Sequence, residues 1–88
     1  MPETVKTWSV YLIQCGDGSL YCGMSNDVAR RISEHQAQGP KCARYLRGKI
    51  PLQLVYQREI GSRSKAAREE LRIKSLHRNA KLKLVSET

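Results

Sequence analysis

Residues 9–23 read SVYLIQCGDGSLYCG and decide the fold. Two apolar runs, rich in β-branched and aromatic residues, flank the turn sequence Gly16-Asp17-Gly18. This arrangement is typical of a β-hairpin. We expect its strands to cover about residues 7–15 and 20–24.

The length of the hairpin loop determines which side chains share a face of the sheet. A two-residue turn would pair Gln14 with Tyr21 and place Tyr11 and Tyr21 on opposite faces. A three-residue loop, with Gly18 in the left-handed region, pairs Ile13 with Tyr21 and puts both tyrosines on one face. We prefer the second register because it collects the apolar side chains on the other face. These are Val10, Leu12, Leu20 and Cys22.

The rest of the chain alternates helical and extended patterns. A helix is predicted over about residues 27–38, capped by Ser25 or Asn26 and ended by Gly39-Pro40. A short helix is expected over 41–47, and a long one over about 64–78. A last segment over 81–85 is helical or extended.

A third strand is indicated after Pro51, where Leu52, Leu54 and Tyr56 alternate with Gln53, Val55 and Gln57. Together the elements predict an α+β fold with a small three-stranded antiparallel sheet flanked by helices. With 88 residues the chain has room for one domain, residues 1–88, with a core over about 7–85.

Charge points to the class of partner. Sixteen Lys and Arg against eight acidic residues give a formal net charge of +8. This excess favours a polyanion, and we expect DNA, with RNA as the alternative.

Composition also indicates the compartment. Three cysteines without a CxxC pair argue against a disulfide framework or structural zinc and favour a reducing cytoplasm. No apolar run reaches the ~18 residues of a membrane span. The polar start, residues 1–4, argues against a signal peptide.

Four residues suggest a site that cleaves phosphodiesters. In the preferred register Tyr11 and Tyr21 share a face of the hairpin. Arg31 and His35 are one turn apart on the following helix, beside the apolar Val28 and Ile32 stripe. An arginine offers a fixed fork of donors for a phosphate, and tyrosine and histidine side chains can position or move protons.

A carboxylate interrupts the apolar stripe of the long predicted helix. Glu70 lies among Ala66, Ile73, Leu76 and Ala80. Burying it costs several kcal/mol unless a cation compensates the charge. One interpretation is a salt bridge to Lys74, worth about 0.3–0.5 kcal/mol. Beside the tyrosine–arginine group, a divalent-metal ligand is the interpretation we favour.

In these motifs the chain resembles the GIY-YIG nucleases, in particular the small stand-alone members. Ser9-Val10-Tyr11 and Tyr21-Cys22-Gly23 match the two motifs that name the family, although Ser9 replaces a glycine and Cys22 an isoleucine. The step from Tyr21 to Arg31, the spacing of Arg31 and His35, and Glu70 on the helix after the third strand also match.

The resemblance implies a metal-dependent nuclease that cuts DNA with low sequence specificity, with a role in DNA repair or recombination. Glu70 would hold Mg²⁺ or Mn²⁺, and Arg31 would bind the scissile phosphate. Tyr11 or Tyr21 would activate water, and His35 would relay the proton. Larger members carry a further asparagine near the site. Asn79 lies nine residues after Glu70, closer than that role leads us to expect, and without it catalysis would be slower or Lys81 would complete the geometry.

Basic residues outside this group are expected to bind the nucleic-acid backbone without reading sequence. They are Arg44, Arg47, Lys49, Arg68, Arg72 and Lys74. Two other functions remain open: a non-catalytic nucleic-acid-binding module that retains the fold, and an accessory subunit whose protein partner supplies the choice of substrate.

Overall fold

The computed structural model describes residues 7–87, and within them the strands form one antiparallel sheet with the order β2-β1-β3. Residues 1–6, which include the polar start discussed above, and residue 88 lie outside the described part. The elements in chain order are β1 (Trp8–Gln14), β2 (Leu20–Ser25), α1 (Val28–Ala37), the 3-10 helix η1 (Arg44–Leu46), β3 (Gln53–Gly61), α2 (Arg63–Lys74) and α3 (Arg78–Ser86).

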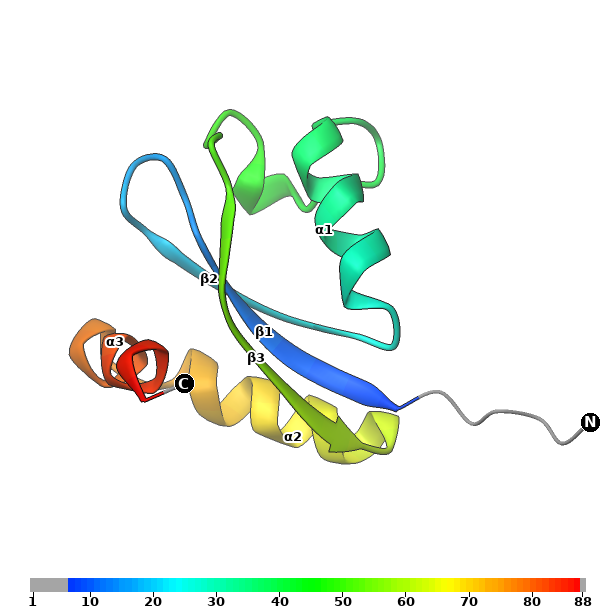
Figure 1. The fold of residues 1–88 in the computed structure, drawn as a ribbon, viewed down its shortest axis with the longest axis vertical. Coiled ribbons are helices and arrows are strands. Elements are labelled where there is room, and N and C mark those ends of the chain that lie inside the picture. Colours follow the sequence, from blue (N-terminus) through cyan, green and yellow to red (C-terminus); the bar gives the residue numbers. More distant parts are fainter. Residues whose placement is uncertain (1–6, 88) are drawn as a thin grey trace, which may run out of the picture.

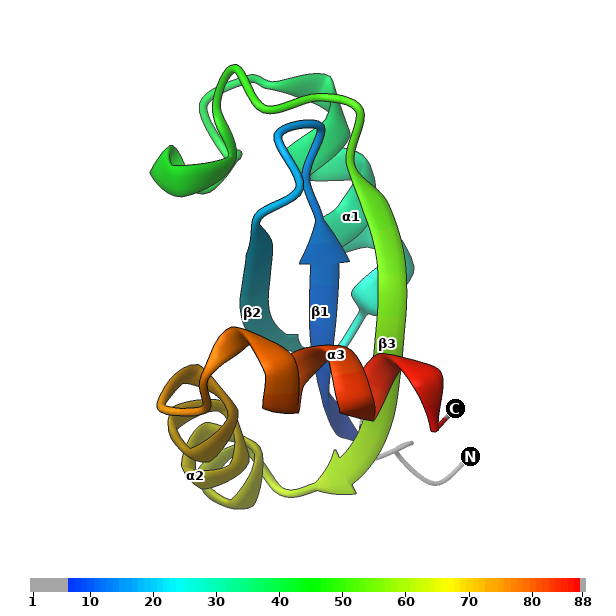
Figure 2. The ribbon, with the colours of Figure 1, turned by 90° about the vertical axis from the view of Figure 1, so that its left-hand side faces the viewer.

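The helices cover both faces of the sheet. Helix α1 lies on one face, whereas α2 and α3 lie on the other (Figure 1). Seen face-on, α3 crosses in front of the sheet and α1 lies behind it (Figure 2). The predicted α+β fold, a three-stranded antiparallel sheet flanked by helices, is confirmed.

The hairpin adopts the preferred register. Ile13 lies opposite Tyr21, and Gln14 lies opposite Leu20. The Cys15 amide donates to the Ser19 carbonyl over 2.9 Å, which closes a three-residue loop. Gly18 has a φ of 87° in this loop, a region that glycine enters without steric cost. Tyr11 and Tyr21 therefore share a face.

Each face of the sheet has its own core. Tyr11, Ile13, Val28, Leu46 and Leu52 are buried between the sheet and the α1–η1 segment, together with Cys15 and Cys42. Val10, Leu12, Cys22, Ala66 and Ile73 are buried on the α2–α3 side, together with Tyr56. The predicted layer of Val10, Leu12 and Cys22 is thus present, while Leu20 at the strand end is only half-buried.

Tyr11 packs over a glycine on the neighbouring strand. Gly23 lies directly opposite Tyr11, and a β-carbon at Gly23 would lie 2.5 Å from the Tyr11 hydroxyl oxygen and 2.6 Å from the ring carbon Cζ. Glycine at this place therefore makes room for a ring that lies across the strand rather than upright.

The third strand departs from simple alternation. Leu12 pairs with Tyr56 but Ile13 pairs with Leu54, so Val55 is an extra residue in a β-bulge. The bulge turns Tyr56 to the α2–α3 face, whereas Leu52 stays in the α1 core. The alternation expected of Leu52, Leu54 and Tyr56 is therefore interrupted at Val55.

Three predictions about helix ends also need correction. Asp27, rather than Ser25 or Asn26, caps α1, because its Oδ1 accepts from the Arg30 amide; Ser25 instead accepts from the Asp27 amide. The short helix expected over 41–47 is only the single turn η1.

The long helix ends at Lys74 rather than Arg78. Ser75 donates its hydroxyl to the Arg72 carbonyl, and His77 is extended before α3 begins. Such side-chain bonds to the backbone compete with helix continuation. The expected apolar stripe is consequently divided between two helices, with Ala66 and Ile73 on α2 and Ala80 on α3.

The Tyr11–Gly23 packing predicts a large effect for a small change. Gly23→Ala should lower the free energy of unfolding by about 1–3 kcal/mol, because the new methyl group overlaps the Tyr11 ring. Gly39→Ala is the matched control, since a β-carbon there would meet nothing within 4 Å. Urea denaturation of both variants gives the comparison, and equal effects would contradict the proposed overlap.

Candidate active site

The site is built on the face where the two tyrosines lie together. His35 projects from α1 onto this face, and its Nε2 lies 3.1 Å from the Tyr11 hydroxyl oxygen in a buried hydrogen bond. Tyr21 meets the same imidazole edge-on, with 5.8 Å between ring centroids. The predicted neighbours Tyr11, Tyr21 and His35 are thus in contact.

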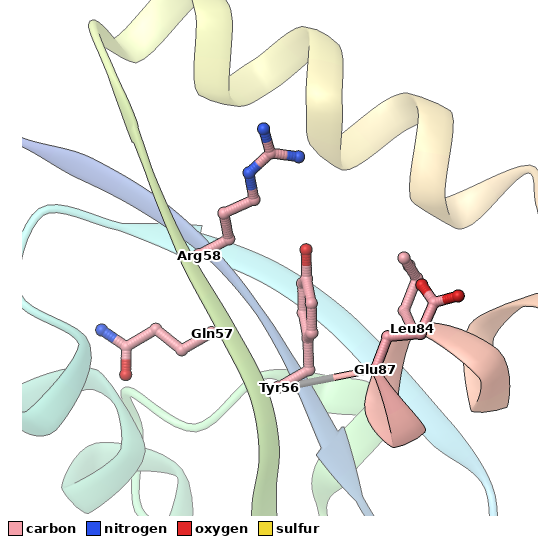
Figure 3. A pocket seen from close by; sticks show the side chains of 5 residues that line it. All are labelled: Tyr56, Gln57, Arg58, Leu84 and Glu87. Atoms are coloured by element: carbon pink, nitrogen blue, oxygen red, sulfur yellow. The ribbon is translucent and has the colours of Figure 1, made fainter.

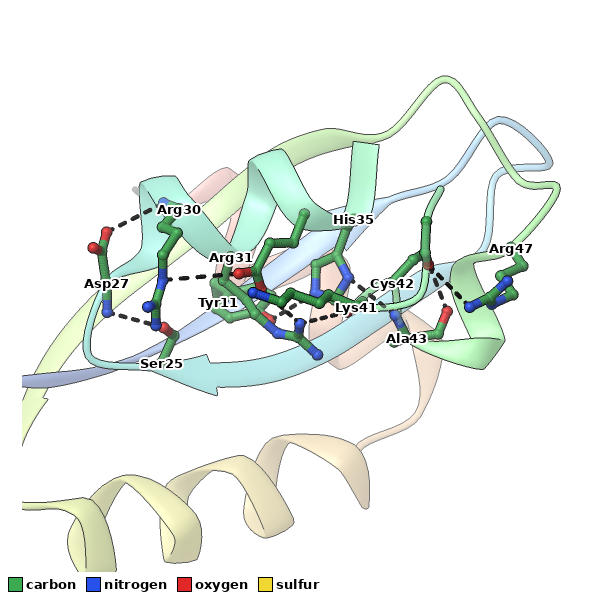
Figure 4. Close-up of polar contacts among 12 residues, drawn as sticks. Tyr11, Ser25, Asp27, Arg30, Arg31, His35, Lys41, Cys42, Ala43 and Arg47 are labelled. Atoms are coloured by element: carbon green, nitrogen blue, oxygen red, sulfur yellow. Dashed lines mark hydrogen bonds and ion pairs between the residues drawn. The ribbon is translucent and has the colours of Figure 1, made fainter. Parts of the chain in front are cut away.

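The segment after α1 determines which nitrogen of His35 carries the proton. The Ala43 amide, which can only donate, lies 3.3 Å from His35 Nδ1 (Figure 4). In the neutral imidazole the proton is then on Nε2, so His35 donates to Tyr11. Burial, with Arg31 as a second cause, lowers the pKa of His35, which favours this neutral form.

Arg31 is held in place by its neighbours. Its Nη1 donates to Glu34 Oε1 over 3.0 Å and to the Lys41 carbonyl over 2.6 Å (Figure 4). Although burial opposes it, the hydrogen bond to Glu34 raises the pKa of Arg31, which stays charged. The preceding Arg30 is far more exposed and only approaches Glu34, at 3.9 Å.

The two tyrosines differ in their access to solvent. Tyr11 is 1% exposed, whereas Tyr21 is half-buried at the surface. Burial is the main cause that raises the pKa of both hydroxyls above 10.0, and Arg31 opposes the rise in each. Both are therefore neutral at neutral pH in the free protein.

Glu70 acts on the two tyrosines of the site through its charge. It belongs to α2, on the other side of the sheet, and its carbonyl lies 3.9 Å from Cys22 Sγ. Its charge contributes to raising the pKa of both Tyr11 and Tyr21. The Lys74 ammonium lies 3.6 Å from its carboxylate, so the predicted salt bridge is present.

Glu70 could hold a metal ion only weakly by itself. Among residues 7–87 no group of three or more His, Cys, Asp and Glu side chains is placed to bind one. A single hard oxygen ligand, with a side chain 18% exposed, fits Mg²⁺ or Mn²⁺ that keeps most of its waters. Lys74 would have to leave the carboxylate when the ion binds.

The structure does not bring the two remaining candidates, Asn79 and Lys81, to the group formed by the tyrosines and Arg31. Asn79 is exposed on α3, while Lys81 lies close enough to Cys22 to lower the pKa of its thiol. The pKa of Cys22 is nevertheless raised to about 11, chiefly by burial. Neither residue contacts Tyr11, Tyr21 or Arg31.

Several of the predicted backbone-binding residues already have partners in the protein. Arg47 donates to the Gly39 carbonyl, and Lys49 lies beside Asp17. Arg72 makes two hydrogen bonds to Glu69. Among the described residues, the side chains of Arg44 and Arg68 make no hydrogen bond or ion pair, so they are free to bind phosphate.

A shallow cavity of about 290 Å³ lies on the far side of the sheet. Tyr56, Gln57 and Arg58 of β3 line it together with Leu84 and Glu87 at α3 (Figure 3). None of the candidate catalytic residues lines this cavity, so it is separate from the site.

Sequence reasoning missed the residues that hold the site in position. Glu34 fixes Arg31, and the Ala43 amide fixes His35. Gln38 binds the carbonyls of His35 and Leu46 and the amide of Gly48. The spacing of Arg31 and Glu34 could have indicated the first pair. The amide contacts depend on loop geometry that no local pattern encodes.

Comparison with known proteins agrees with the geometry. The family model described as the GIY-YIG catalytic domain matches residues 7–83. The chain belongs to the GIY-YIG family. Its members have a nuclease-type domain, and the GIY and YIG motifs fall on β1 and β2 as Ser9-Val10-Tyr11 and Tyr21-Cys22-Gly23.

Curated relatives in this family are UPF0213 proteins. One from Desulfotalea psychrophila is 45% identical over 96% of this chain and 76% of its own length. Another, from Cronobacter sakazakii, is 48% identical over 93% of this chain and 84% of its own length. The solution NMR structure of UPF0213 protein BH0048 from Bacillus halodurans is 40% identical, with a TM-score of 0.59, and covers 93% of this chain and 85% of that one.

One further property concerns membranes. Within residues 7–87 of this GIY-YIG chain, the helices are too short or too polar to cross a bilayer.

The buried His35 predicts how stability depends on pH. Because its folded pKa lies below the ordinary value of 6.5, the unfolded chain binds this proton more tightly. The stability that neutral His35 contributes is therefore complete above pH 6.5 and is lost as the pH falls through the lower folded pKa. Over this window the free energy of unfolding should fall by at most about 1.4 kcal/mol per pH unit.

Urea denaturation between pH 5 and 7.5 measures this dependence, and His35→Gln should flatten it. The carboxyl groups of Asp17, Glu34 and Glu69 have pKa values lowered from 3.8–4.5, so their own losses of stability occur at more acidic pH. An unchanged slope in His35→Gln would show that His35 is not the responsible group.

The two neighbouring arginines of α1 should differ in their effect on cleavage. Arg31→Ala should lower the rate by about a hundredfold or more, because a charge-stabilising donor is lost. Arg30→Ala should change the rate by less than about threefold. Single-turnover cleavage of a plasmid measures both, and equal losses would instead indicate diffuse phosphate binding by this helix.

Proposed function

We propose that this protein is a divalent-metal-dependent nuclease that hydrolyses DNA phosphodiester bonds with little sequence specificity. The GIY-YIG family is one of nuclease-type domains, and its members generally depend on a divalent metal. The metal dependence, the choice of DNA and a role in repair or recombination in the cytoplasm are our extension of that family assignment.

The observation that carries the proposal is the contact of Tyr11 and Tyr21 with His35, one helical turn from Arg31, with Glu70 near enough for its charge to act on both tyrosines. Tyr11, Arg31 and Glu70 come from three different elements, yet Arg31 and Glu70 both influence the pKa of Tyr11 and of Tyr21. Hydrolysis of a phosphodiester needs hydrogen-bond donors and a metal ligand close together. Two neutral hydroxyls, a fixed guanidinium and a carboxylate are groups of these types.

Each residue can be given a role from its surroundings. Arg31 would bind a non-bridging oxygen of the phosphate, since Glu34 and the Lys41 carbonyl fix its guanidinium. Tyr21, the more exposed tyrosine, would contact the phosphate or the attacking water through its hydroxyl. Tyr11 would form the buried floor of the site beneath them.

The hydrogen bonds of His35 lead us to propose a role for it that differs from the one expected from the sequence. Its Nε2–H donates to Tyr11 while Nδ1 accepts from Ala43, so both ring nitrogens are occupied. We therefore propose that His35 donates a hydrogen bond to the Tyr11 oxygen and keeps that hydroxyl in position. This role replaces the proton relay expected from the sequence. The Tyr11 proton is then available to an acceptor other than His35.

Glu70 is the residue that would hold Mg²⁺ or Mn²⁺. When bound there, the ion would supply charge neutralisation for the phosphate and lower the pKa of water beside it. Lys74, released from Glu70, would add a second positive charge at the substrate. The net charge of +8, with unpaired Arg44 and Arg68, would provide affinity for the backbone.

The Glu70–Lys74 ion pair also favours a second candidate function. A carboxylate neutralised by a lysine 3.6 Å away needs no metal, which is consistent with a non-catalytic nucleic-acid-binding module or an accessory subunit. A protein partner would then supply the catalytic step or the choice of substrate.

One pair of substitutions separates these functions. Glu70→Gln should retain the fold and abolish magnesium- or manganese-dependent cleavage of plasmid DNA, because the amide is a poor ligand for either ion. Glu69→Gln is the matched control, since Glu69 is paired with Arg72 and Arg58 and lies outside the site. It should cut at nearly the wild-type rate.

Binding of Mn²⁺, followed by electron paramagnetic resonance, should be weakened in Glu70→Gln and unchanged in Glu69→Gln. Cleavage by Glu70→Gln at the wild-type rate would refute the metal assignment. Binding of DNA without any cleavage by the wild-type protein would support the second function.

A further inference from the structure

An exposed aromatic side chain extends the site outward. Tyr45 of η1 is 45% exposed, and its ring stacks on Tyr21 with centroids 5.7 Å apart and an interplanar angle of 27°. Tyr21 in turn contacts His35, so three rings form a row from the buried Tyr11–His35 pair to the surface.

The backbone that carries Tyr45 is firmly held. The next residue, Leu46, is fully buried, and its carbonyl accepts from Gln38 Nε2 over 3.1 Å. The Gly48 amide donates to Gln38 Oε1 over 2.7 Å. A large apolar ring on a fixed backbone at the surface is a ready contact for a flat ligand, because little ordering is needed on binding.

Besides Tyr21, the Tyr45 ring has a cation against it that can leave. The Lys49 ammonium lies 3.5 Å from the Tyr45 centroid and 3.8 Å from Asp17, whose side chain is 52% exposed. The Lys49 side chain is only partly exposed, at 28%, and contacts of a partly exposed lysine with an aromatic ring and with an exposed carboxylate are still weak. Lys49 can therefore leave the Tyr45 ring and Asp17 and bind a phosphate instead.

The charges around Tyr45 favour a nucleic acid as the occupant. Arg44 precedes it, Arg47 and Lys49 follow it, and Arg44 has no side-chain partner among the described residues. Base–aromatic stacking accepts any base and is combined with basic backbone contacts in proteins that hold single strands. In an intact duplex the faces of a base are already stacked on its neighbours, so only an unpaired base can bind here.

We propose that Tyr45 is the stacking platform for an unpaired nucleobase next to the phosphate held at Tyr21 and Arg31. This inference rests on the proposed nuclease function and adds to it the class of substrate: DNA or RNA with single-stranded nucleotides at the cut. Lys49 moves from the Tyr45 ring to a flanking phosphate when the base enters.

The test uses short single-stranded oligonucleotides in which one abasic residue is moved through successive positions. Affinities are measured with Glu70→Gln protein, so that the strand stays intact, and the cut is mapped with wild-type protein. At one position beside the cut, loss of the base should weaken binding by about 5- to 150-fold, the range for one stacked base. DNA and RNA versions of the strand show which sugar is preferred.

Substitutions at Tyr45 should remove this dependence selectively. Tyr45→Phe and Tyr45→Trp should retain it, whereas Tyr45→Ala and Tyr45→Leu should bind the intact and the abasic strand equally. Because the ratio is taken within each variant, a partly unfolded preparation does not alter it. The same dependence in Tyr45→Ala as in the parent would overturn the proposal.

Failure of the nuclease function is distinguishable from failure of the platform. If the wild-type protein cuts DNA but shows no abasic effect at any position, only the platform is wrong. If it neither binds nor cuts any strand, both are wrong. A Tyr45→Ala variant that loses stability but keeps the abasic effect would show that Tyr45 and Lys49 only fasten η1 to the hairpin loop.

Discussion

The packing of Tyr11 across Gly23 is the constraint on which the rest of the site depends. It requires a glycine directly opposite the tyrosine, and only one hairpin register provides that pair. In this register Tyr21 falls on the same face, and the hydroxyl of Tyr11 comes within 3.1 Å of His35. A shift of one residue would move every side chain of β2 to the opposite face and separate the site residues.

The second constraint is the hydrogen-bonded connection between α1 and η1. Gln38 binds backbone groups on both sides of the connection, the Ala43 amide orients His35, and the Lys41 carbonyl holds Arg31. These contacts join two catalytic candidates to one loop, so the loop conformation and the site geometry are coupled. The same connection carries Tyr45, and its conformation therefore also places the outermost ring of the aromatic row.

The sequence predicted what local patterns encode and missed what depends on distant contacts. The fold class, the hairpin register and the buried Val10, Leu12 and Cys22 follow from alternation and turn chemistry. The end of α2 at Lys74 lacks a glycine or proline signal and comes from a Ser75 hydroxyl bond, so periodicity alone extended that helix too far. The bulge at Val55 and the contact of Tyr45 with Tyr21 depend on residues more than twenty positions apart. The roles assigned to Tyr11, Tyr21, Arg31, His35 and Glu70 remain predictions for the experiments described above.

The position of β2 at the edge of the sheet has a consequence for assembly. Within the described sheet β2 has a neighbouring strand on one side only, and it carries Tyr21, so its open side adjoins the proposed site. A partner that added a strand there would lie directly beside Tyr21, where we expect it to hinder the binding of substrate. The opposite margin, along β3, lies two strands away. A fused domain or a tether attached along β3 is therefore farther from Tyr21 than one attached along β2.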